Sequence, residues 1–355
     1  MYMGREGPRI FFGKAGDRVK DGPALSEVET AVAEEVTVLG RETRRSQVRV
    51  RISGDRIFEI VTFGLAAVII PLLLGLAVAL AVDSMPAIRK FGLSFLISTE
   101  WNPVSDLYGA LPFIWGTAVS SAIALMIAVP LSLGAALCLS EMAPGWLSRR
   151  LGFLVDLLAA IPSVVYGLWA IFVLGPWIRD HIEPPLATYL GWLPLFKGPK
   201  VAVGMLSAGV ILAIMVIPYI SSVCTDVFRT VPQTQREAAF ALGATKWEMV
   251  RMAVLPFGLT GVTAAIILGL GRALGETIAV AMVIGNSPQI SASLFQPAAT
   301  LASVIANEFA EATTEMYVSA LIELGLVLLA VGVALNVVGR LLVAGVVQRR
   351  FDTKA

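Results

Sequence analysis

The stretch IFEIVTFGLAAVIIPLLLGLAVALAV at residues 57–82 decides the fold class, because its single charged side chain, Glu59, stands in an otherwise apolar run. About 20 predominantly apolar residues in helical conformation cross the hydrocarbon core of a bilayer. Further stretches of this kind follow along the chain, at residues 110–139, 151–178, 201–223, 259–284 and 317–346. The sequence therefore predicts an all-α integral membrane protein with six transmembrane helices.

The composition agrees with this interpretation and narrows the possible functions. Of the 355 residues, 57% are hydrophobic and 15% are charged, whereas soluble domains carry about 25% charged residues. The net charge of +1 gives no basic excess for binding nucleic acid. The single histidine, His181, and the two cysteines, Cys138 and Cys224, lack the spacing of metal ligands. We therefore expect neither a metal site nor a catalytic cluster.

The distribution of lysine and arginine predicts how the spans are oriented, because cytoplasmic loops carry an excess of these residues. With the N-terminus inside, the inner segments carry twenty of the 27 lysines and arginines, at residues 1–56, 140–150, 224–258 and 347–355. The outer segments carry five, at residues 83–109, 179–200 and 285–316. We predict that both termini are cytoplasmic, with a largely flexible tail at 1–56, an outer loop at 83–109 and a second tail at 347–355.

The longest inner loop, TVPQTQREAAFALGATKWEMVRMAVLP at residues 230–256, has the pattern of two short helices. Apolar side chains recur at helical intervals, first around Phe240 and again from Trp247 onward. Gly243 interrupts the run, and Pro256 is predicted to end it. We expect such a loop either to dock with another protein or to pack on the bundle as a helical hairpin.

The chain has no motif for hydrolysing nucleotides by itself. A phosphate-binding loop reads G-x-x-x-x-G-K-[ST]. The nearest approach, Gly13 followed by Lys14, lacks the upstream glycine and continues with Ala15. Energy from ATP would therefore have to arrive through another subunit.

The fifth predicted span contains LGLGRALGETIAV at residues 268–280, with Arg272 and Glu276 near its middle. A charge at the centre of a membrane helix costs about 2.5–3.5 kcal/mol on insertion scales. Residues four apart lie on the same face of a helix. We expect the two side chains either to form a buried ion pair that fixes packing or to line a passage for an anion. Arginine presents a planar fork of donors that suits phosphate oxygens.

Other residues of the predicted spans are given lesser roles. Gly271 and Gly275 form a G-x-x-x-G pair, which permits close approach of two helices, and we predict a packing role for them. Asp156 and Glu323 are further acidic residues in the spans. We rank both below Arg272 and Glu276, because each lies near the end of its span or faces a partner subunit.

Several of these features resemble a known family. The inner loop resembles the EAA loop of bacterial ABC importer permeases at Glu237, Ala238, Ala239, Gly243, Leu255 and Pro256. It departs from that pattern at Ala253, where the family usually has isoleucine. Residues 159–176, 268–286 and 300–312 are similar to the PstC-type permeases of phosphate-specific importers. The resemblance extends over nearly the whole chain after the N-terminal tail.

The resemblance implies a type I ABC importer permease fold, with its transmembrane domain at residues 110–346, in the plasma (inner) membrane of a bacterium. It implies a heterodimer with a PstA-type permease, a PstB-type ATPase dimer that binds ATP and Mg, and a PstS-type phosphate-binding protein outside. The EAA residues would couple to the ATPase, with Glu237 facing it. Arg272 and Glu276 match the charged pair that the family uses in phosphate passage. No cofactor is expected in this chain itself.

Two other functions stay open at this point. A permease for another anion or small solute would share the loop and the architecture. A stand-alone channel or an intramembrane enzyme belongs to a different class. An enzyme would need a nucleophile–base pair or a metal cluster within the spans, and the sequence contains no such arrangement.

Overall fold

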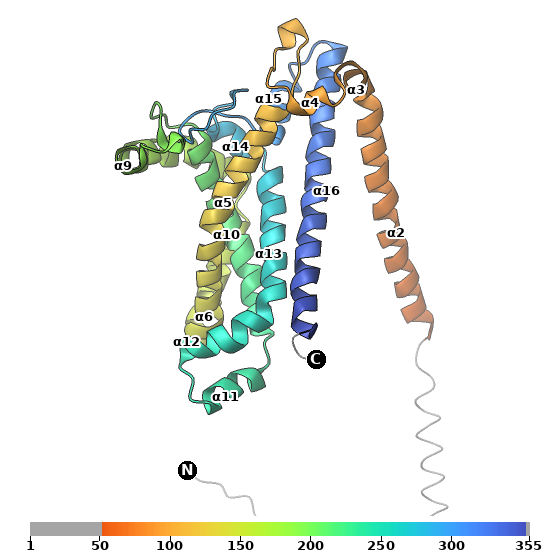
Figure 1. Ribbon diagram of the computed structural model, residues 1–355. Helices are drawn as coiled ribbons and strands as arrows, with labels where there is room; N and C mark the ends of the chain where they lie inside the picture. The colour runs from red at the N-terminus through yellow and green to blue at the C-terminus, as the bar shows by residue number, and fades with distance from the viewer. Residues whose placement is uncertain (1–51, 353–355) are drawn as a thin grey trace, which may run out of the picture. The chain divides into compact units, whose positions relative to one another are not determined.

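The structure, a computed structural model, describes residues 52–352, so the predicted tail at 1–56 lies almost wholly outside the described range. The chain divides into two compact units, residues 1–72 and 73–355. The described part of the first unit is the beginning of helix α2, Ile52–Asp83. The second unit contains the end of α2 and all later helices (Figure 1).

The regular elements of the described residues are all helical, apart from two isolated β-bridges. After α2 the helices are α3 Met85–Phe91, α4 Ser94–Ile97, α5 Leu111–Leu137, α6 Gly145–Ala159, α7 Ser163–Trp169, α8 Gly175–Trp177, α9 Glu183–Leu190, α10 Met205–Arg229, α11 Gln233–Ala241, α12 Lys246–Met249, α13 Leu255–Gly275, α14 Ile278–Val283, α15 Leu301–Glu308 and α16 Glu315–Asp352. Short π-helical turns join several of them, at Cys138–Met142, Ala170–Leu174, Ile178–Ile182 and Val250–Val254. Short 3-10 helices occur at Pro103–Ser105 and Pro194–Phe196. The predicted all-α fold class is confirmed.

The long apolar helices agree with a protein that crosses the membrane several times. Among the described residues, 5 helices are long and apolar enough to span, at Phe58–Asp83, Leu111–Met142, Met205–Arg229, Lys246–Gly275 and Glu315–Leu341. A further candidate is a bent pair, Gly145–Ala159 and Ser163–Leu190, whose two halves meet at 88°. The expected six spans are reached when this bent pair counts as one.

The predicted third span, residues 151–178, is therefore not one straight helix. α6 ends at Ala159 and α7 begins at Ser163, with Pro162 between them at φ −59° and ψ 140°. Proline donates no backbone hydrogen bond and disfavours helical conformation in the residue before it, which here is Ile161. The apolar composition predicted one crossing, but Pro162 breaks it.

The helix of the predicted fifth span, residues 259–284, is displaced toward the inner loop. It begins at Lys246, passes through the turn Val250–Val254 and ends at Gly275. Pro256 does not end the loop's second helix, as the sequence predicted, but lies in the first turn of α13. Proline leaves one helical acceptor without a donor, and the π-helical turn directly before it is where the hydrogen-bond pattern adjusts.

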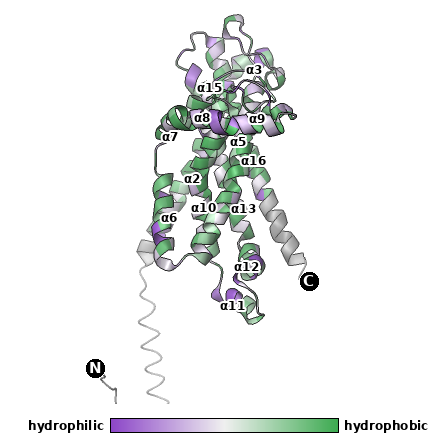
Figure 2. Cartoon of the chain, turned by 90° about the vertical axis from the view of Figure 1, so that its left-hand side faces the viewer, coloured by the Kyte–Doolittle hydropathy of each residue, from purple (hydrophilic) through white to green (hydrophobic). Residues whose placement is uncertain are grey.

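The centre of the bundle is the packing of α10 against α5 and α13 (Figures 1 and 2). A Cβ atom built on Gly209 of α10 would lie 2.5 Å from Ile123 Cγ2 of α5, so the two helices touch closely there. Ser132 Oγ donates to the Ile217 carbonyl oxygen at 3.1 Å across the same interface. Small residues and hydrogen bonds of this kind hold membrane helices together, because lipid provides no hydrophobic drive between them.

A second buried cluster attaches residues 84–110 to the beginning of α16. Trp101 Nε1 and Tyr317 Oη both donate to Glu308 Oε2, at 2.8 and 2.6 Å. Tyr108 stacks on Tyr317 with ring centroids 5.7 Å apart. The predicted outer loop at 83–109 is therefore a packed structure that contains α3 and α4.

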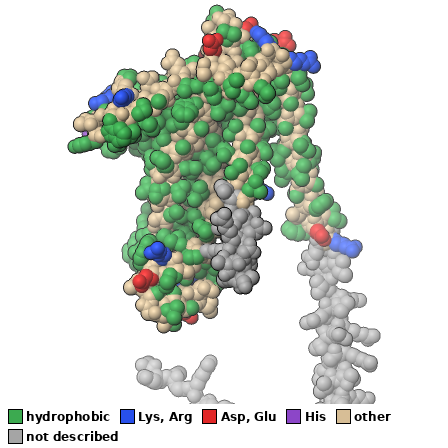
Figure 3. Space-filling view, viewed as in Figure 1, with side chains coloured by type: hydrophobic (Ala, Val, Ile, Leu, Met, Phe, Trp, Pro, Cys, Tyr) green, Lys and Arg blue, Asp and Glu red, His purple; other side chains and the backbone are tan. Residues whose placement is uncertain are grey.

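Charged side chains of the second unit gather toward its two ends on the face shown in Figure 3, with hydrophobic side chains between them. One end carries the exposed residues Arg89, Lys90 and Glu315 of α3 and α16. The other end carries the exposed residues Glu237 and Lys246 of α11 and α12. This distribution is that of a multi-pass membrane protein, whose middle faces hydrocarbon.

Candidate functional site

Arg272 lies in the last turn of α13, at a break within the predicted fifth span. The helix ends at Gly275, Glu276 is extended with φ −69° and ψ 125°, and α14 begins two residues later. Thr277 Oγ1 donates to the Gly275 carbonyl oxygen at 3.2 Å and satisfies one of the acceptors that a helix end exposes. Arg272 is therefore next to the negative end of a helix dipole, where a cation is stabilised.

The guanidinium group of Arg272 lies against an aromatic ring. Its central carbon is 4.7 Å from the ring centroid of Tyr219 on α10. Its Nε is buried and has no hydrogen-bond partner among the described residues. A cation–π contact stabilises by about 0.5–2 kcal/mol. It uses the face of the guanidinium, so the N–H donors at the edge stay available for an anion.

Arg272 and Glu276 do not form the ion pair that their spacing suggested. Neither belongs to an ion pair among the side chains that the structure describes, where the pairs are Arg179 with Asp180, Arg229 with Asp226, and Arg236 with Glu141. The expectation of a shared helical face was wrong, because α13 ends one residue before Glu276. Both side chains are half-buried. Their role in anion passage stays a prediction.

Gly271 and Gly275 are not at a helix crossing within this chain. Outside their own helix, no heavy atom lies within 4 Å of a Cβ built on either residue. Two other glycines of α13 hold such positions. A Cβ on Gly269 would lie 2.7 Å from Ile220 Cγ1, and one on Gly261 would lie 2.5 Å from Val227 Cγ2. The packing role of Gly271 and Gly275 stays a prediction.

The inner loop folds as two helices with a turn at Gly243. α11 ends at Ala241, two residues before Gly243, whose φ of +79° lies in the left-handed region that glycine adopts without strain. Thr245 begins the next helix with a capping box, in which its backbone N–H donates to Glu248 Oε2 at 2.8 Å. The backbone N–H of Glu248 donates in return to Thr245 Oγ1 at 3.4 Å. Local chemistry thus fixes the geometry of the loop.

The exposed side of this loop carries large apolar side chains beside a carboxylate. Glu237 and Ala238 are exposed, whereas Ala239 is buried. We define the coupling surface by the exposed residues Glu237, Ala238, Phe240, Leu242 and Trp247. Leu242 exposes 85% of its surface and Trp247 exposes 64%. Apolar side chains rimmed by charge on an exposed patch are typical of protein interfaces.

A buried ion pair attaches α11 to the rest of the bundle. Arg236 Nη2 lies 2.7 Å from Glu141 Oε1, and Nε lies 3.1 Å from Oε2, with the side chains 13% and 5% exposed. The same guanidinium donates to the carbonyl oxygens of Phe228, at 2.8 Å, and Val231. Glu141 belongs to the π-helical turn that follows α5. The sequence analysis did not identify this pair, which joins α11 to the ends of α5 and α10.

One continuous helix connects the coupling surface with Arg272. It runs from Lys246 to Gly275, a length of about 45 Å at 1.5 Å per residue. Trp247 lies near its beginning and Arg272 in its last turn. A force applied to the loop therefore acts directly on the helix that carries the charged residue.

Two other acidic residues of the spans have contrasting surroundings. Asp156 on α6 is exposed and accepts a hydrogen bond from Ser222 Oγ at 3.1 Å. Glu323 on α16 is 6% exposed, and its Oε2 has no hydrogen-bond partner within the described part of the chain. Among the side chains that the structure describes, no three His, Cys, Asp or Glu gather as a metal site. Glu323 is thus a buried acid without a partner, whereas Asp156 already has a donor.

Comparisons with known proteins add a family to these features. Residues 128–351 match the family described as binding-protein-dependent transport system inner membrane component. The "Phosphate transport system permease protein PstC" of Xylella fastidiosa is 49% identical over 293 residues, which cover 81% of this chain and 90% of that protein. The protein of the same name from Mesorhizobium japonicum is 45% identical over 292 residues, with coverage of 81% and 89%.

A solved structure supports the fold alone. It is a bacterial ABC transporter involved in the import of the acidic polysaccharide alginate, and it covers 85% of this chain and 98% of its own. The TM-score is 0.50 and the sequence identity is 14%. The helices described above therefore have the arrangement of a type I ABC importer permease.

Proposed function

The chain belongs to the family of binding-protein-dependent transport system inner membrane components, and on this premise we propose that it is the permease subunit of an ATP-driven importer of inorganic phosphate. The observation that carries the proposal is its identity of 45% and 49% with two phosphate permeases over 81% of the chain. We further propose the bacterial plasma (inner) membrane, with both termini cytoplasmic. The excess of lysine and arginine in the predicted inner segments supports that orientation.

The proposed importer needs three further components. A PstA-type permease completes the pathway as a heterodimer with this chain. A PstB-type ATPase dimer binds and hydrolyses ATP with Mg, and a PstS-type binding protein delivers phosphate from outside. The coupling surface supports docking of the ATPase, because its exposed apolar side chains, Leu242 and Trp247 foremost, need a partner to leave water. In this proposal the permease breaks no bond in phosphate and holds no cofactor.

We assign Arg272 to the passing anion, and Glu276, at the break directly after α13, is the second residue that we place on the pathway. The charge of Arg272 is permanent, and its edge donors match the oxygens of phosphate. Transporters commonly place substrate sites at interrupted membrane helices, and α13 is interrupted directly after Arg272. The Tyr219 ring and the negative end of the helix dipole compensate part of the charge. A partly compensated site binds phosphate weakly enough to release it.

Two routes lead from the coupling surface to this site. Closure of the ATPase dimer on ATP displaces α11, which pulls on α5 through Arg236 and Glu141. The same displacement moves the continuous helix from Lys246 to Gly275, which carries Arg272. The pathway then opens outward to accept phosphate and returns inward after hydrolysis, so ATP shifts the population between two states.

Uptake of radiolabelled phosphate into vesicles that contain the complete importer tests the substrate assignment. We expect uptake to require ATP and to exceed uptake of sulfate. Arg272→Gln is expected to lower phosphate uptake at least about a hundredfold, because it removes charge-assisted hydrogen bonds of about 1.5–3 kcal/mol each. The complex should still assemble.

Arg340→Gln is the matched control, since it removes an exposed arginine of the predicted sixth span. We expect it to leave phosphate uptake unchanged. Normal uptake by the Arg272→Gln variant would remove the anion-path assignment. Faster uptake of sulfate than of phosphate would change the substrate, and phosphate flux without ATP would indicate a channel.

Docking of the ATPase is tested separately with Glu237→Ala. We expect weaker copurification of the ATPase, or ATP hydrolysis that continues without phosphate uptake. Glu311→Ala serves as control, because Glu311 is also exposed but follows α15, far along the chain from the loop. If Glu237→Ala left copurification and transport-coupled hydrolysis normal, Glu237 would have no docking role.

A further inference from the structure

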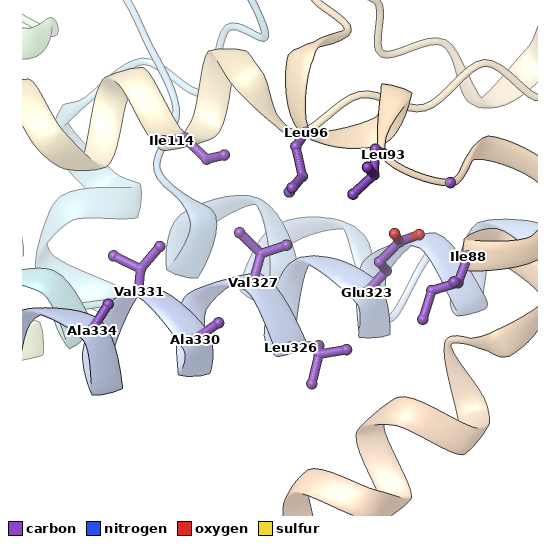
Figure 4. Close-up of a pocket in the computed structure, with 11 residues that line it drawn as sticks. Ile88, Leu93, Leu96, Ile114, Glu323, Leu326, Val327, Ala330, Val331 and Ala334 are labelled. Carbon is purple, nitrogen blue, oxygen red and sulfur yellow. The ribbon is translucent and has the colours of Figure 1, made fainter.

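A groove on the surface of α16 is lined almost entirely by apolar side chains (Figure 4). It has a volume of about 650 Å³. Leu96 of α4 faces Val327 of α16 across it, and Ile114 of α5 faces Val331 (Figure 4). Glu323 is the single charged residue in its lining.

The carboxyl group of Glu323 lies at one end of this groove, close to Leu93 and Ile88 (Figure 4). The residue is 6% exposed, and its Oε2 has no hydrogen-bond partner among the side chains and backbone that the structure describes. A buried acid without a donor is costly in low-dielectric surroundings, and it is either neutralised or matched by a cationic partner. A ligand that brings donors to this end of the groove would therefore be stabilised there.

The length of the groove corresponds to one leaflet of a bilayer. Its lining on α16 runs from Glu323 to Ala334, which spans about 16 Å at 1.5 Å per residue. Half of a hydrocarbon core of about 30 Å is about 15 Å. An acyl chain whose head group reached Glu323 would therefore lie along Val327 and Val331 to Ala334.

A neighbouring cavity extends this apolar space. It has a volume of about 490 Å³ and shares Ile114, Val331 and Ala334 with the groove. Its other lining residues include Leu270 and Leu274 of α13. The two spaces together offer room for both acyl chains of one phospholipid.

Positive charges lie beyond the Glu323 end of the groove. Ile88, which lines the groove, is followed in α3 by the exposed residues Arg89 and Lys90. Lys90 Nζ donates to the Asp106 carbonyl oxygen at 3.3 Å, while Arg89 has no ion-pair partner in the described part of the chain. A head group with an ammonium for Glu323 and a phosphate for Arg89 matches both charges.

We propose that this groove is a binding site for a phospholipid with a primary ammonium head group, of the phosphatidylethanolamine class. A primary ammonium brings three donors to the carboxylate, whereas a quaternary ammonium brings none and a purely anionic head group is repelled by it. A partner helix fits less well, because a spanning helix crosses both leaflets and the groove ends after one. The site is independent of the transported solute.

Retention of lipid by the purified importer tests this site. The complex with the full chain is reconstituted in vesicles of equal parts phosphatidylethanolamine, phosphatidylcholine and phosphatidylglycerol, extracted in mild detergent and examined by native mass spectrometry. We expect phosphatidylethanolamine to be retained over the other two lipids. Glu323→Gln is expected to lower this preference about tenfold, which corresponds to about 1.4 kcal/mol.

Asp156→Asn is the matched control, since it neutralises an acid in another helix that already accepts a hydrogen bond. We expect it to leave the lipid preference unchanged. Equal retention of the three lipids by the unmodified complex would overturn the proposal. An unchanged preference in Glu323→Gln would do the same.

A measurement on the unmodified chain covers the case in which Glu323→Gln does not fold. Phosphatidylethanolamine with a photoreactive group in its acyl chain is added to the complex, and the crosslinked peptides are identified. We expect crosslinks to peptides containing Val327, Val331 or Leu96. Crosslinks confined to other parts of the chain or to a partner subunit would refute the lipid site.

Discussion

Arg236 and Arg272 are two arginines of the second unit with opposite surroundings. Arg236 makes two hydrogen bonds to Glu141 and two to backbone carbonyls, and its side chain is 13% exposed. Arg272 has the Tyr219 ring against its guanidinium and no ion-pair partner among the described side chains. A guanidinium has five N–H donors. Arg236 uses most of them inside the chain, whereas the guanidinium of Arg272 donates no hydrogen bond to the side chains and backbone that the structure describes.

The difference separates Arg236, whose charge stabilises the fold, from Arg272, whose charge we propose to bind the transported anion. The Arg236 guanidinium joins α11 to the ends of α5 and α10. In the proposed mechanism these bonds must persist while the ATPase moves the loop. A transported anion, by contrast, needs donors that are free when it arrives and free again when it leaves. Tyr219 positions Arg272 without occupying its edge donors, which a carboxylate would do.

The largest effect is expected when Glu141 is removed. Glu141→Ala leaves the Arg236 guanidinium buried without its carboxylate, and breaking a buried ion pair from one side costs about 3–5 kcal/mol. We expect the free energy of unfolding to fall by about this amount. We also expect ATP hydrolysis to continue with less phosphate uptake, because α11 loses its attachment to α5. Denaturation of the purified complex in mild detergent and paired rates of hydrolysis and uptake measure both effects.

Asp226→Ala is the matched control for Glu141→Ala. Its ion pair with Arg229 is 3.9 Å long, and the side chains are 51% exposed for Arg229 and 77% for Asp226. The loss of stability should therefore stay below about 1 kcal/mol. A double variant with Met at positions 141 and 236 should regain part of the stability, because no buried charge is then unpaired. Equal losses of stability for Glu141→Ala and Asp226→Ala would mean that the Arg236–Glu141 pair stabilises the fold no more than an exposed pair does. The contrast between Arg236 and Arg272 would then be wrong.

The features of the fold and of the candidate site that depend on neighbouring residues along the chain were predictable from the sequence. The apolar runs predicted the all-helical membrane fold, because a span is a local property of about 20 residues. Gly243 predicted the turn of the inner loop, since the left-handed conformation there is a property of one residue. Arg272 was recognised because a charge within an apolar span is conspicuous.

The parts that depend on packing were not predictable. Arg236 and Glu141 are separated by 95 positions in the sequence. They pair only because the fold brings α11 next to the end of α5. Tyr219 was overlooked because an aromatic residue in a span is most often ordinary core. Glu276 was misplaced because the apolar residues after Gly275 suggested an unbroken helix, whereas the helix ends there. The G-x-x-x-G pair of Gly271 and Gly275 did not indicate the close contact at Gly269, since a motif does not state which face of a helix meets a neighbour within the chain.

The next largest effect is expected when the close contact between α13 and α10 is disturbed, because this contact brings Arg272 to Tyr219. A Cβ on Gly269 would lie 2.7 Å from Cγ1 of Ile220, which directly follows Tyr219 in α10. Gly269→Ala therefore forces α13 and α10 apart or displaces Ile220, and overpacking of this kind costs about 1–3 kcal/mol. We expect lower stability together with reduced phosphate uptake, measured by denaturation and transport on the same preparation.

Gly271→Ala is the control for Gly269→Ala, because the added methyl group enters open space two residues along the same helix. The stability of the isolated chain should not change. Copurification of the second permease with Gly271→Ala then tests the predicted packing role directly, and weaker copurification is the expected result. If both variants destabilised the isolated chain equally, the close contact at Gly269 would not be what positions Arg272.

The smallest effect is expected for substitutions of Tyr219. They test whether the aromatic ring positions Arg272, as the carboxylate of Glu141 positions Arg236. Tyr219→Phe keeps the ring and should leave phosphate uptake near normal. Tyr219→Leu removes a contact of about 0.5–2 kcal/mol, so uptake should fall about two- to thirtyfold. Equal losses in the two variants would mean that the ring does not hold the guanidinium and that a partner subunit must. Since Arg236 is satisfied within its own chain, the two arginines would then differ in which subunit satisfies them.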